Sequence, residues 1–125
     1  MLVEVNSETD FVARNPKFAE LGRDIAMHIA AMSPQYLDRA SVPQEIVDQV
    51  RAEFRNNVPA GKPADVAEKI VEGKLNKWYE EHVLLDQPFV KDDSLSVNDL
   101  INAAVGSLGE NIKVRRFTKF ALGEN

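Results

Sequence analysis

The sequence EVNSETDFVAR, residues 4–14, decides how the rest of this chain is arranged. It continues a short apolar run, Leu2–Val5, which is typical of a β-strand, and then becomes a polar turn at Asn6–Asp10. A strand of this length is not stable alone. It therefore has to pair with a C-terminal strand, with another chain, or with a segment outside this sequence.

Two apolar residues, Phe11 and Val12, come directly after the turn and stand beside the carboxylate of Asp10. Two interpretations of this arrangement are open. In the first, Thr9 or Asp10 is a helix N-cap, whose side-chain oxygen accepts a free backbone N–H, and Phe11 belongs to the core. In the second, Phe11 is presented to a partner, because loops run over the surface of proteins.

A long helix is predicted to follow from Asn15-Pro16. Asparagine is a good N-cap, and proline at the first helical position loses no hydrogen bond. Ser33-Pro34 ends the helix. His28 lies beside the apolar stripe, and the only other histidine is His82, so we expect His28 to pack or to lie at the surface. The stripe repeats every three or four residues and consists of Phe18, Leu21, Ile25, Ile29 and Met32.

Four further helices are predicted from apolar periodicity and from their end signals. Gly73 is interpreted as a left-handed C-terminal cap that separates two of them. Ser96 and Asp99 resemble a capping box at the start of the last one. The predicted helices begin and end near Pro43 and Phe54, Pro63 and Gly73, Lys74 and Leu85, and Ser96 and Gly109.

The chain is predicted to return to a strand at Ile112–Leu122. Phe117 breaks its alternation of apolar residues, which indicates either a bulge near Arg115-Arg116 or a strand covered on both faces. Four cations fall within seven residues of this strand. They are compatible with a charged edge strand, an RNA-binding patch or partner contacts. These cations are Lys113, Arg115, Arg116 and Lys119.

The composition of the 125 residues excludes several classes of function. The net charge is −5, from 20 acidic and 15 basic residues, which argues against broad nucleic-acid binding. The absence of cysteine excludes disulfides, thiolate metal sites and cysteine nucleophiles, and it fits a reducing compartment. Neither an apolar run of about 18 residues nor a secretory leader pattern is seen. No phosphate-binding glycine loop, metal-ligand spacing or catalytic constellation stands out, so we expect neither an enzyme nor a cofactor.

Three separate stretches resemble one protein family. Residues 6–14, NSETDFVAR, look like the Thr-Asp-Phe-Val signature of bacterial and organellar elongation factor Ts, the nucleotide-exchange factor of elongation factor Tu. The stretches QPFVKD at residues 87–92 and GENIKVRRF at residues 109–117 resemble two further motifs of that family. All three occur in the family's order and together span nearly the whole chain, which makes the resemblance specific.

The resemblance implies both a fold and a function. The dimerisation domain of the family is a two-layer α+β structure with helices packed on a small antiparallel sheet. Residues 1–125 would form this domain, in the short form of the family that has one core. The implied function is guanine-nucleotide exchange on elongation factor Tu during translation elongation. It would take place in the cytoplasm or in an organellar matrix or stroma. Short members pair as homodimers, so a homodimer is expected.

The resemblance also implies which residues act on the partner. In the family, the residues that match Asp10 and Phe11 push between helices of the nucleotide domain of elongation factor Tu. They disturb its magnesium site and phosphate-binding loop, so GDP leaves. The exchange loop implied for this sequence consists of Thr9, Asp10, Phe11, Val12, Ala13 and Arg14.

Two other functions are alternatives to nucleotide exchange. Family members usually begin with a three-helix module that resembles a ubiquitin-associated domain, followed by another strand, and neither has a match in these residues. The chain is therefore also interpreted as a dimeric interaction module without exchange activity. A third hypothesis is a small RNA-binding domain that uses residues 113–119. An exchange factor would need no direct contact with nucleotide, nucleic acid or membrane.

Overall fold

The N-terminal strand pairs with the C-terminal strand, which is one of the three pairings predicted from the sequence. In the computed structural model, which describes residues 2–118, strand β1 (Leu2–Ser7) lies antiparallel to strand β4 (Ile112–Thr118). The pairing runs from Leu2 opposite Thr118 to Ser7 opposite Ile112. Residues 119–122 of the predicted strand, including Lys119, lie outside the described residues.

The irregular alternation of the C-terminal strand is explained by a bulge. Glu4 is opposite Arg116, whereas the next residue, Val5, is opposite Val114. Arg115 is therefore the extra residue in β4, which shifts the side chains that follow it to the other phase. The bulge interpretation is confirmed, and it accounts for the phase of Phe117.

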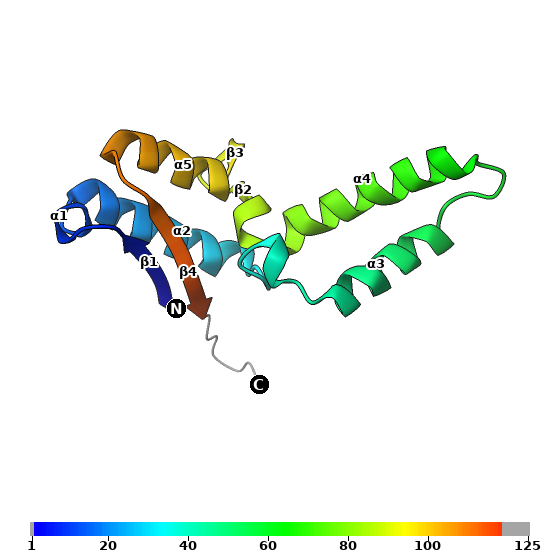
Figure 1. Cartoon of the computed structure of the whole chain (residues 1–125), viewed down its shortest axis with the longest axis horizontal. Coiled ribbons are helices and arrows are strands. Elements are labelled where there is room, and N and C mark those ends of the chain that lie inside the picture. Colours follow the sequence, from blue (N-terminus) through cyan, green and yellow to red (C-terminus); the bar gives the residue numbers. More distant parts are fainter. Residues whose placement is uncertain (1, 119–125) are drawn as a thin grey trace.

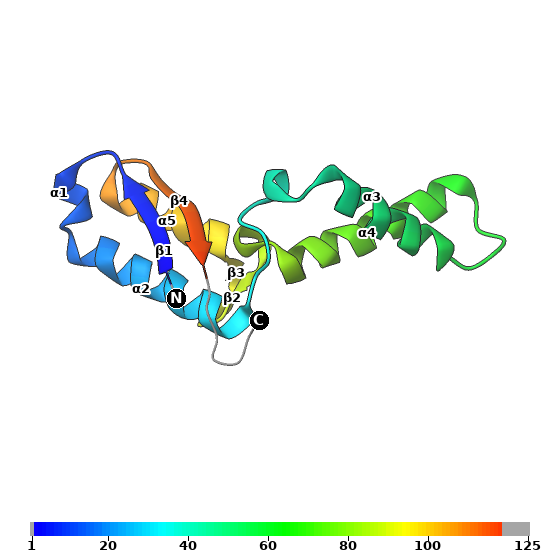
Figure 2. The same ribbon diagram turned by 90° about the horizontal axis from the view of Figure 1, so that it is seen from below.

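Helices form a second layer on this two-stranded sheet. Figure 2 shows β1 and β4 side by side across helices α2 (Pro16–Met32) and α5 (Val97–Leu108), with β1 packed on α2 and β4 packed on α5. The predicted α+β, two-layer architecture is confirmed. Its core consists of Leu21, Ile25, Ile29, Leu84, Phe89, Val97, Ile101, Ile112 and Val114.

The ends of both helices follow the sequence signals. The side chain of Asn15 caps α2 by accepting the backbone N–H of Lys17 at 2.9 Å. At the start of α5, Ser96 and Asp99 form a complete capping box, with both bonds 3.1 Å long. Gly109 then ends α5 with φ of +76°, in the left-handed region where a residue without Cβ is unstrained.

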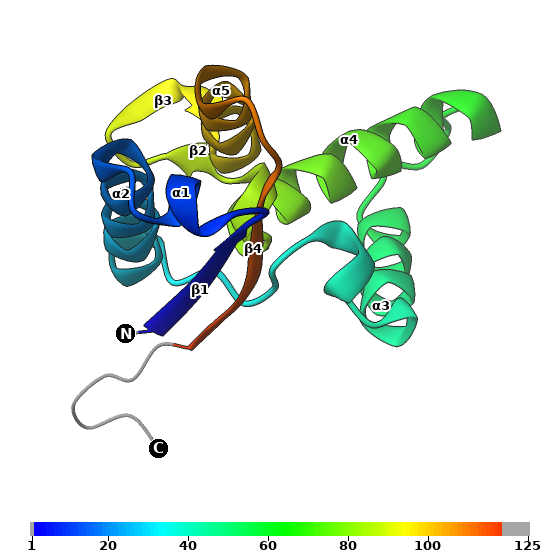
Figure 3. The same cartoon turned by 60° about the vertical axis from the view of Figure 1, so that its left-hand side comes forward.

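A small hairpin precedes α5. Its strands, β2 (Pro88–Phe89) and β3 (Asp92–Ser96), pair antiparallel with each other. The 3₁₀ helix η2 (Leu84–Asp86) directly precedes it, and a second 3₁₀ helix, η1 (Arg39–Ser41), precedes helix α3 (Gln44–Asn56) and is joined to η2 by the Arg39–Asp86 ion pair. Figure 3 shows this hairpin at one side of α2 and α5, away from the β1–β4 sheet.

Two further helices form an arm that projects from this body (Figure 1). Helix α3 (Gln44–Asn56) packs antiparallel on helix α4 (Ala64–His82). The exposed ion pairs Arg55–Glu68, at 3.1 Å, and Arg51–Glu72 join the two helices. The arm has its own apolar cluster, built on Val42, Val47, Leu75 and Val83.

The prediction of two helices separated at Gly73 is wrong. Residues 64–82 form one continuous helix, and Gly73 lies inside it. An interior glycine costs roughly 1 kcal/mol relative to alanine. The packing of α4 on α3 through Val47 and Leu75 offsets that cost, so the local stop signal is overridden.

Two features are absent from residues 2–118. No helix in that range has both the length and the apolar character needed to cross a bilayer. The same residues bring together no group of three or more histidine, aspartate or glutamate side chains that could hold a metal ion.

Candidate functional site

The stretch with the Thr-Asp-Phe-Val signature lies directly beyond the last pair of the β1–β4 ladder. Ser7 faces Ile112 in that last pair, and glutamate side chains continue the same register. The carboxylate of Glu8 accepts the backbone N–H of Asn111 at 3.3 Å. One residue further, the carboxylate of Glu110 accepts the backbone N–H of Thr9 at 2.8 Å. Two hydrogen bonds, one accepted by Glu8 and one accepted by Glu110, therefore connect the loop to the residues just before β4.

The signature itself forms a single helical turn, α1 (Asp10–Ala13). Thr9 is its N-cap, and the Thr9 hydroxyl oxygen accepts the backbone N–H of Val12 at 3.4 Å. The turn closes where the backbone N–H of Arg14 donates to the carbonyl of Asp10 at 3.1 Å. Asn15 follows at once as the cap of α2, so the turn is bounded by fixed elements on both sides.

The two apolar residues of the turn have opposite environments. Val12 is only 5% exposed and anchors the turn in the protein, whereas Phe11 is 85% exposed. The first interpretation was therefore half right, because Thr9 caps a helix but Phe11 does not belong to the core. A benzyl side chain held in water by a capped turn is available for a partner.

The other side chains of the predicted loop also face solvent. Asp10, Ala13 and Arg14 are exposed, and the carboxylate of Asp10 has no hydrogen-bond or ion-pair partner among residues 2–118. Phe11 and Arg14 line a shallow depression together with Asn15 and Pro16. The structure thus brings the six predicted residues together on one turn. No nucleophile and base are paired there, so the turn can bind a partner but offers no covalent chemistry.

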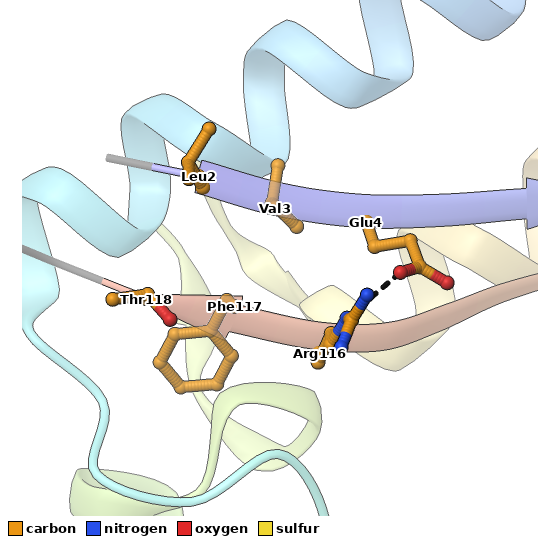
Figure 4. Close-up of a pocket in the computed structure, with 6 residues that line it drawn as sticks. All are labelled: Leu2, Val3, Glu4, Arg116, Phe117 and Thr118. Carbon is orange, nitrogen blue, oxygen red and sulfur yellow. Dashed lines mark hydrogen bonds and ion pairs between the residues drawn. The ribbon is translucent and has the colours of Figure 1, made fainter.

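The basic strand is a weaker candidate site. The Glu4 carboxylate binds Arg116 at 2.8 Å (Figure 4). It also lies 3.7 Å from Arg115. Hydrogen bonds from Asn6 and then from Arg116 hold the pKa of Glu4 below its ordinary value, so it stays charged and partly neutralises the cations. Of the four predicted cations, Lys119 lies outside the described residues.

Sequence patterns alone do not single out Glu8 and Glu110 as functional residues. Both occur in the quoted motifs, but no spacing rule links residues about a hundred positions apart. The register of the β1–β4 pair does contain such a signal. Once Ser7 is placed opposite Ile112, antiparallel pairing puts Glu8 beside Asn111 and Thr9 beside Glu110.

The fold and the turn define a class: an α+β protein that presents an exposed aromatic residue on a capped turn at the end of a sheet. The family model described as Elongation factor TS matches residues 19–124. The chain belongs to the elongation factor Ts family, as the three motifs implied.

Curated relatives match over almost the whole chain. It is 49% identical to "Elongation factor Ts" of Thermodesulfovibrio yellowstonii, covering 99% of this chain and 62% of the relative. It is 52% identical to that of Thermosipho melanesiensis, covering 99% and 64%. For Geobacter sulfurreducens the identity is 50%, covering 99% and 58%. The chain thus spans about three fifths of the length of the curated relatives it matches.

Proposed function

We propose that this chain is a guanine-nucleotide exchange factor for elongation factor Tu in translation elongation. One observation carries the proposal: Phe11, 85% exposed, stands on a capped turn whose next residue, Val12, is buried. Membership of the elongation factor Ts family supports the choice of partner. The protein would act in the cytoplasm or in an organellar matrix, where that GTPase works.

The turn would act by insertion. Burying Phe11 in a pocket of the GTPase contributes about 1.5–3 kcal/mol of binding free energy. The unpartnered carboxylate of Asp10 is free to accept backbone N–H groups of the partner or to disturb magnesium coordination and repel phosphate. Val12 and the Thr9 cap keep the turn in place while these contacts form.

Exchange of this kind needs no chemical step. It requires the factor to bind the nucleotide-free GTPase better than the GDP-bound form. The coupling is reciprocal, so a factor that lowers GDP affinity about a thousandfold is itself bound about a thousandfold more weakly by the GDP form. That corresponds to about 4 kcal/mol, which a few contacts around Phe11 and Asp10 can supply.

The first test is the release of fluorescent GDP from bacterial elongation factor Tu. Phe11→Ala should leave the melting temperature unchanged, because the ring is exposed, and should lower the stimulated release rate about tenfold or more. Met32→Ala is the matched control, because it truncates another exposed apolar side chain, 44% exposed, at the far end of α2. Full stimulation by Phe11→Ala would refute the insertion of Phe11.

The alternative, a dimeric interaction module without exchange activity, is supported by the outer face of the sheet. Leu2 is 71% exposed there. It borders a shallow hollow of about 400 Å³ lined by Val3, Glu4, Arg116, Phe117 and Thr118 (Figure 4). We propose that a second copy of the chain covers this face and that residues 1–125 act as the dimerisation domain. A dimer can also act in nucleotide exchange, so the two proposals are compatible. The GDP-release assay shows whether the chain has exchange activity or pairs without it.

RNA binding receives less support. Arg115 and Arg116 share the carboxylate of Glu4, and the net charge of the chain is −5. A patch of this kind would neutralise few phosphates. We therefore retain the expectation that the chain contacts the GTPase and a second copy, rather than nucleotide, nucleic acid or membrane directly.

A further inference from the structure

The tightest links between the turn and the rest of the protein come from one side chain. The carboxylate of Glu110 accepts the Thr9 backbone N–H at 2.8 Å. It also accepts the Thr9 hydroxyl at 2.9 Å through its second oxygen, with the first oxygen at 3.1 Å from the same hydroxyl. Both hydrogen-bond donors of Thr9 therefore end on one carboxylate. Hydrogen bonds to a charged acceptor are roughly twice as strong as neutral ones.

These bonds orient the cap of α1. The Thr9 hydroxyl has one proton, which goes to Glu110, and its lone pairs then face the backbone N–H of Val12 at 3.4 Å. If the Thr9 side chain rotated away from Glu110, its hydroxyl oxygen would also leave the position from which it caps the Val12 N–H. Glu110 thus acts on Phe11 through Thr9, because Phe11 lies within the capped turn.

Glu110 is itself placed by rigid neighbours. Gly109, with φ of +76°, ends α5 just before it, and the buried Ile112 begins β4 just after it. The backbone N–H of Asn111 is also held by Glu8. These neighbours fix the position of Glu110, so its carboxylate approaches Thr9 in one orientation. The Glu110–Thr9 hydrogen bonds nevertheless lie near the surface.

We propose that Glu110 is the positioning residue of the exchange loop: it holds Thr9 so that the turn presents Phe11 to the partner in a single orientation. The inference rests on the proposed exchange function. Because the turn is already ordered in the free protein, the entropy cost of ordering it does not weaken binding to the partner or reduce the stimulation of GDP release. Glu110 does not need to touch the partner for this role.

The test compares Glu110→Ala, Glu110→Gln and the wild-type chain in two measurements. The first is the backbone order parameter of residues 9–14 from ¹⁵N relaxation of the free protein. The second is the stimulated release of fluorescent GDP from bacterial elongation factor Tu over a range of factor concentrations. Glu80→Ala is the matched control, because Glu80 is an exposed glutamate of α4 without a hydrogen-bond or ion-pair partner among residues 2–118.

For Glu110→Ala, the order parameters at Phe11 and Val12 should fall from about 0.85 to about 0.6 or lower. The maximal rate of GDP release should fall about tenfold or more, as the loss of charged hydrogen bonds predicts, while the half-saturating concentration changes less than the rate. Glu110→Gln keeps one acceptor oxygen and should give intermediate values. The melting temperature and the Glu80→Ala protein should stay close to wild type.

Three results would overturn the proposal. Unchanged order parameters in Glu110→Ala would show that Glu110 does not hold the turn, even if release slows because it touches the partner directly. A disordered turn with full stimulation of release would show that its orientation does not matter. A fall in melting temperature that accounts for the whole loss of activity would make Glu110 a general stabiliser. A wild-type chain that does not stimulate release would refute the exchange function, and the order parameters alone would then decide whether Glu110 holds the turn.

Discussion

His28 joins three parts of the molecule through its imidazole ring. The side chain is fully buried on α2. Its Nδ1 accepts the backbone N–H of Val90 at 3.1 Å, so Nε2 carries the proton and donates to the Gln87 side-chain oxygen at 2.8 Å. Gln87 in turn donates to the carbonyl of Glu81 at 2.9 Å. The neutral ring therefore ties α2 to the β2–β3 turn and to the base of the arm.

This ring should make stability depend on pH. Burial lowers the pKa of His28 below 6.5, with a smaller opposing effect from the Gln87 hydrogen bond. A depressed pKa gives stability that is complete above 6.5 and is lost as the pH falls through the lower pKa of the folded state. Urea unfolding of the wild type should thus give a smaller free energy of unfolding at pH 5.5 than at pH 7.5.

Comparison of variants isolates the contribution of His28. His28→Gln cannot titrate, so it should lose less stability between the two pH values, although it is less stable at both. His82→Gln should keep the wild-type pH dependence, because the His82 ring packs against Trp78 and takes no part in the hydrogen bonds that hold His28. Equal pH dependence in wild type and His28→Gln would contradict the assignment.

At the scale of elements, helix α4 shows packing overriding a local signal. Gly73 has the sequence context of a helix end, yet it lies in the interior of a 19-residue helix. A Cβ built at Gly73 would meet nothing within 4 Å. Gly109 differs, because its φ of +76° is strained for any residue with a side chain.

Gly73→Ala should therefore stabilise the protein by about 0.5–1 kcal/mol, the difference in helix propensity between the two residues. Gly109→Ala, the matched substitution at a true helix end, should destabilise it by about 1 kcal/mol. Chemical denaturation measures both. A loss of stability in Gly73→Ala would indicate that the chain breaks at this glycine in solution.

At the scale of the whole molecule, the chain divides its apolar residues between a body and an arm. The body cluster lies under one face of the β1–β4 sheet, and the arm has its own cluster around Leu75. The opposite face of the sheet is left with the exposed Leu2, whereas the half-buried Phe117 packs against the body cluster. A two-stranded sheet with an uncovered face is a natural place for a second copy.

The wild-type chain should sediment as a dimer of the 14.0 kDa protomer. Leu2→Asp should weaken the dimer about 100-fold or more, because a twofold interface counts each lost apolar contact twice. Val66→Asp is the control, since it places the same charge on an exposed apolar residue of the arm. A wild-type monomer at high micromolar concentration would contradict pairing through this face.

The sequence by itself determined the helix caps at Asn15 and Ser96, the left-handed end at Gly109 and the strand of residues 2–5, because these depend on backbone chemistry within a few positions. It also determined the family, through three motifs in order. Only the tertiary structure decided that Phe11 is exposed while Val12 is buried, that Gly73 lies inside a helix, and that Glu110 meets Thr9. Each of these depends on which distant surface lies opposite a residue. No local pattern encodes that, because packing and strand register bring together residues from distant parts of the chain.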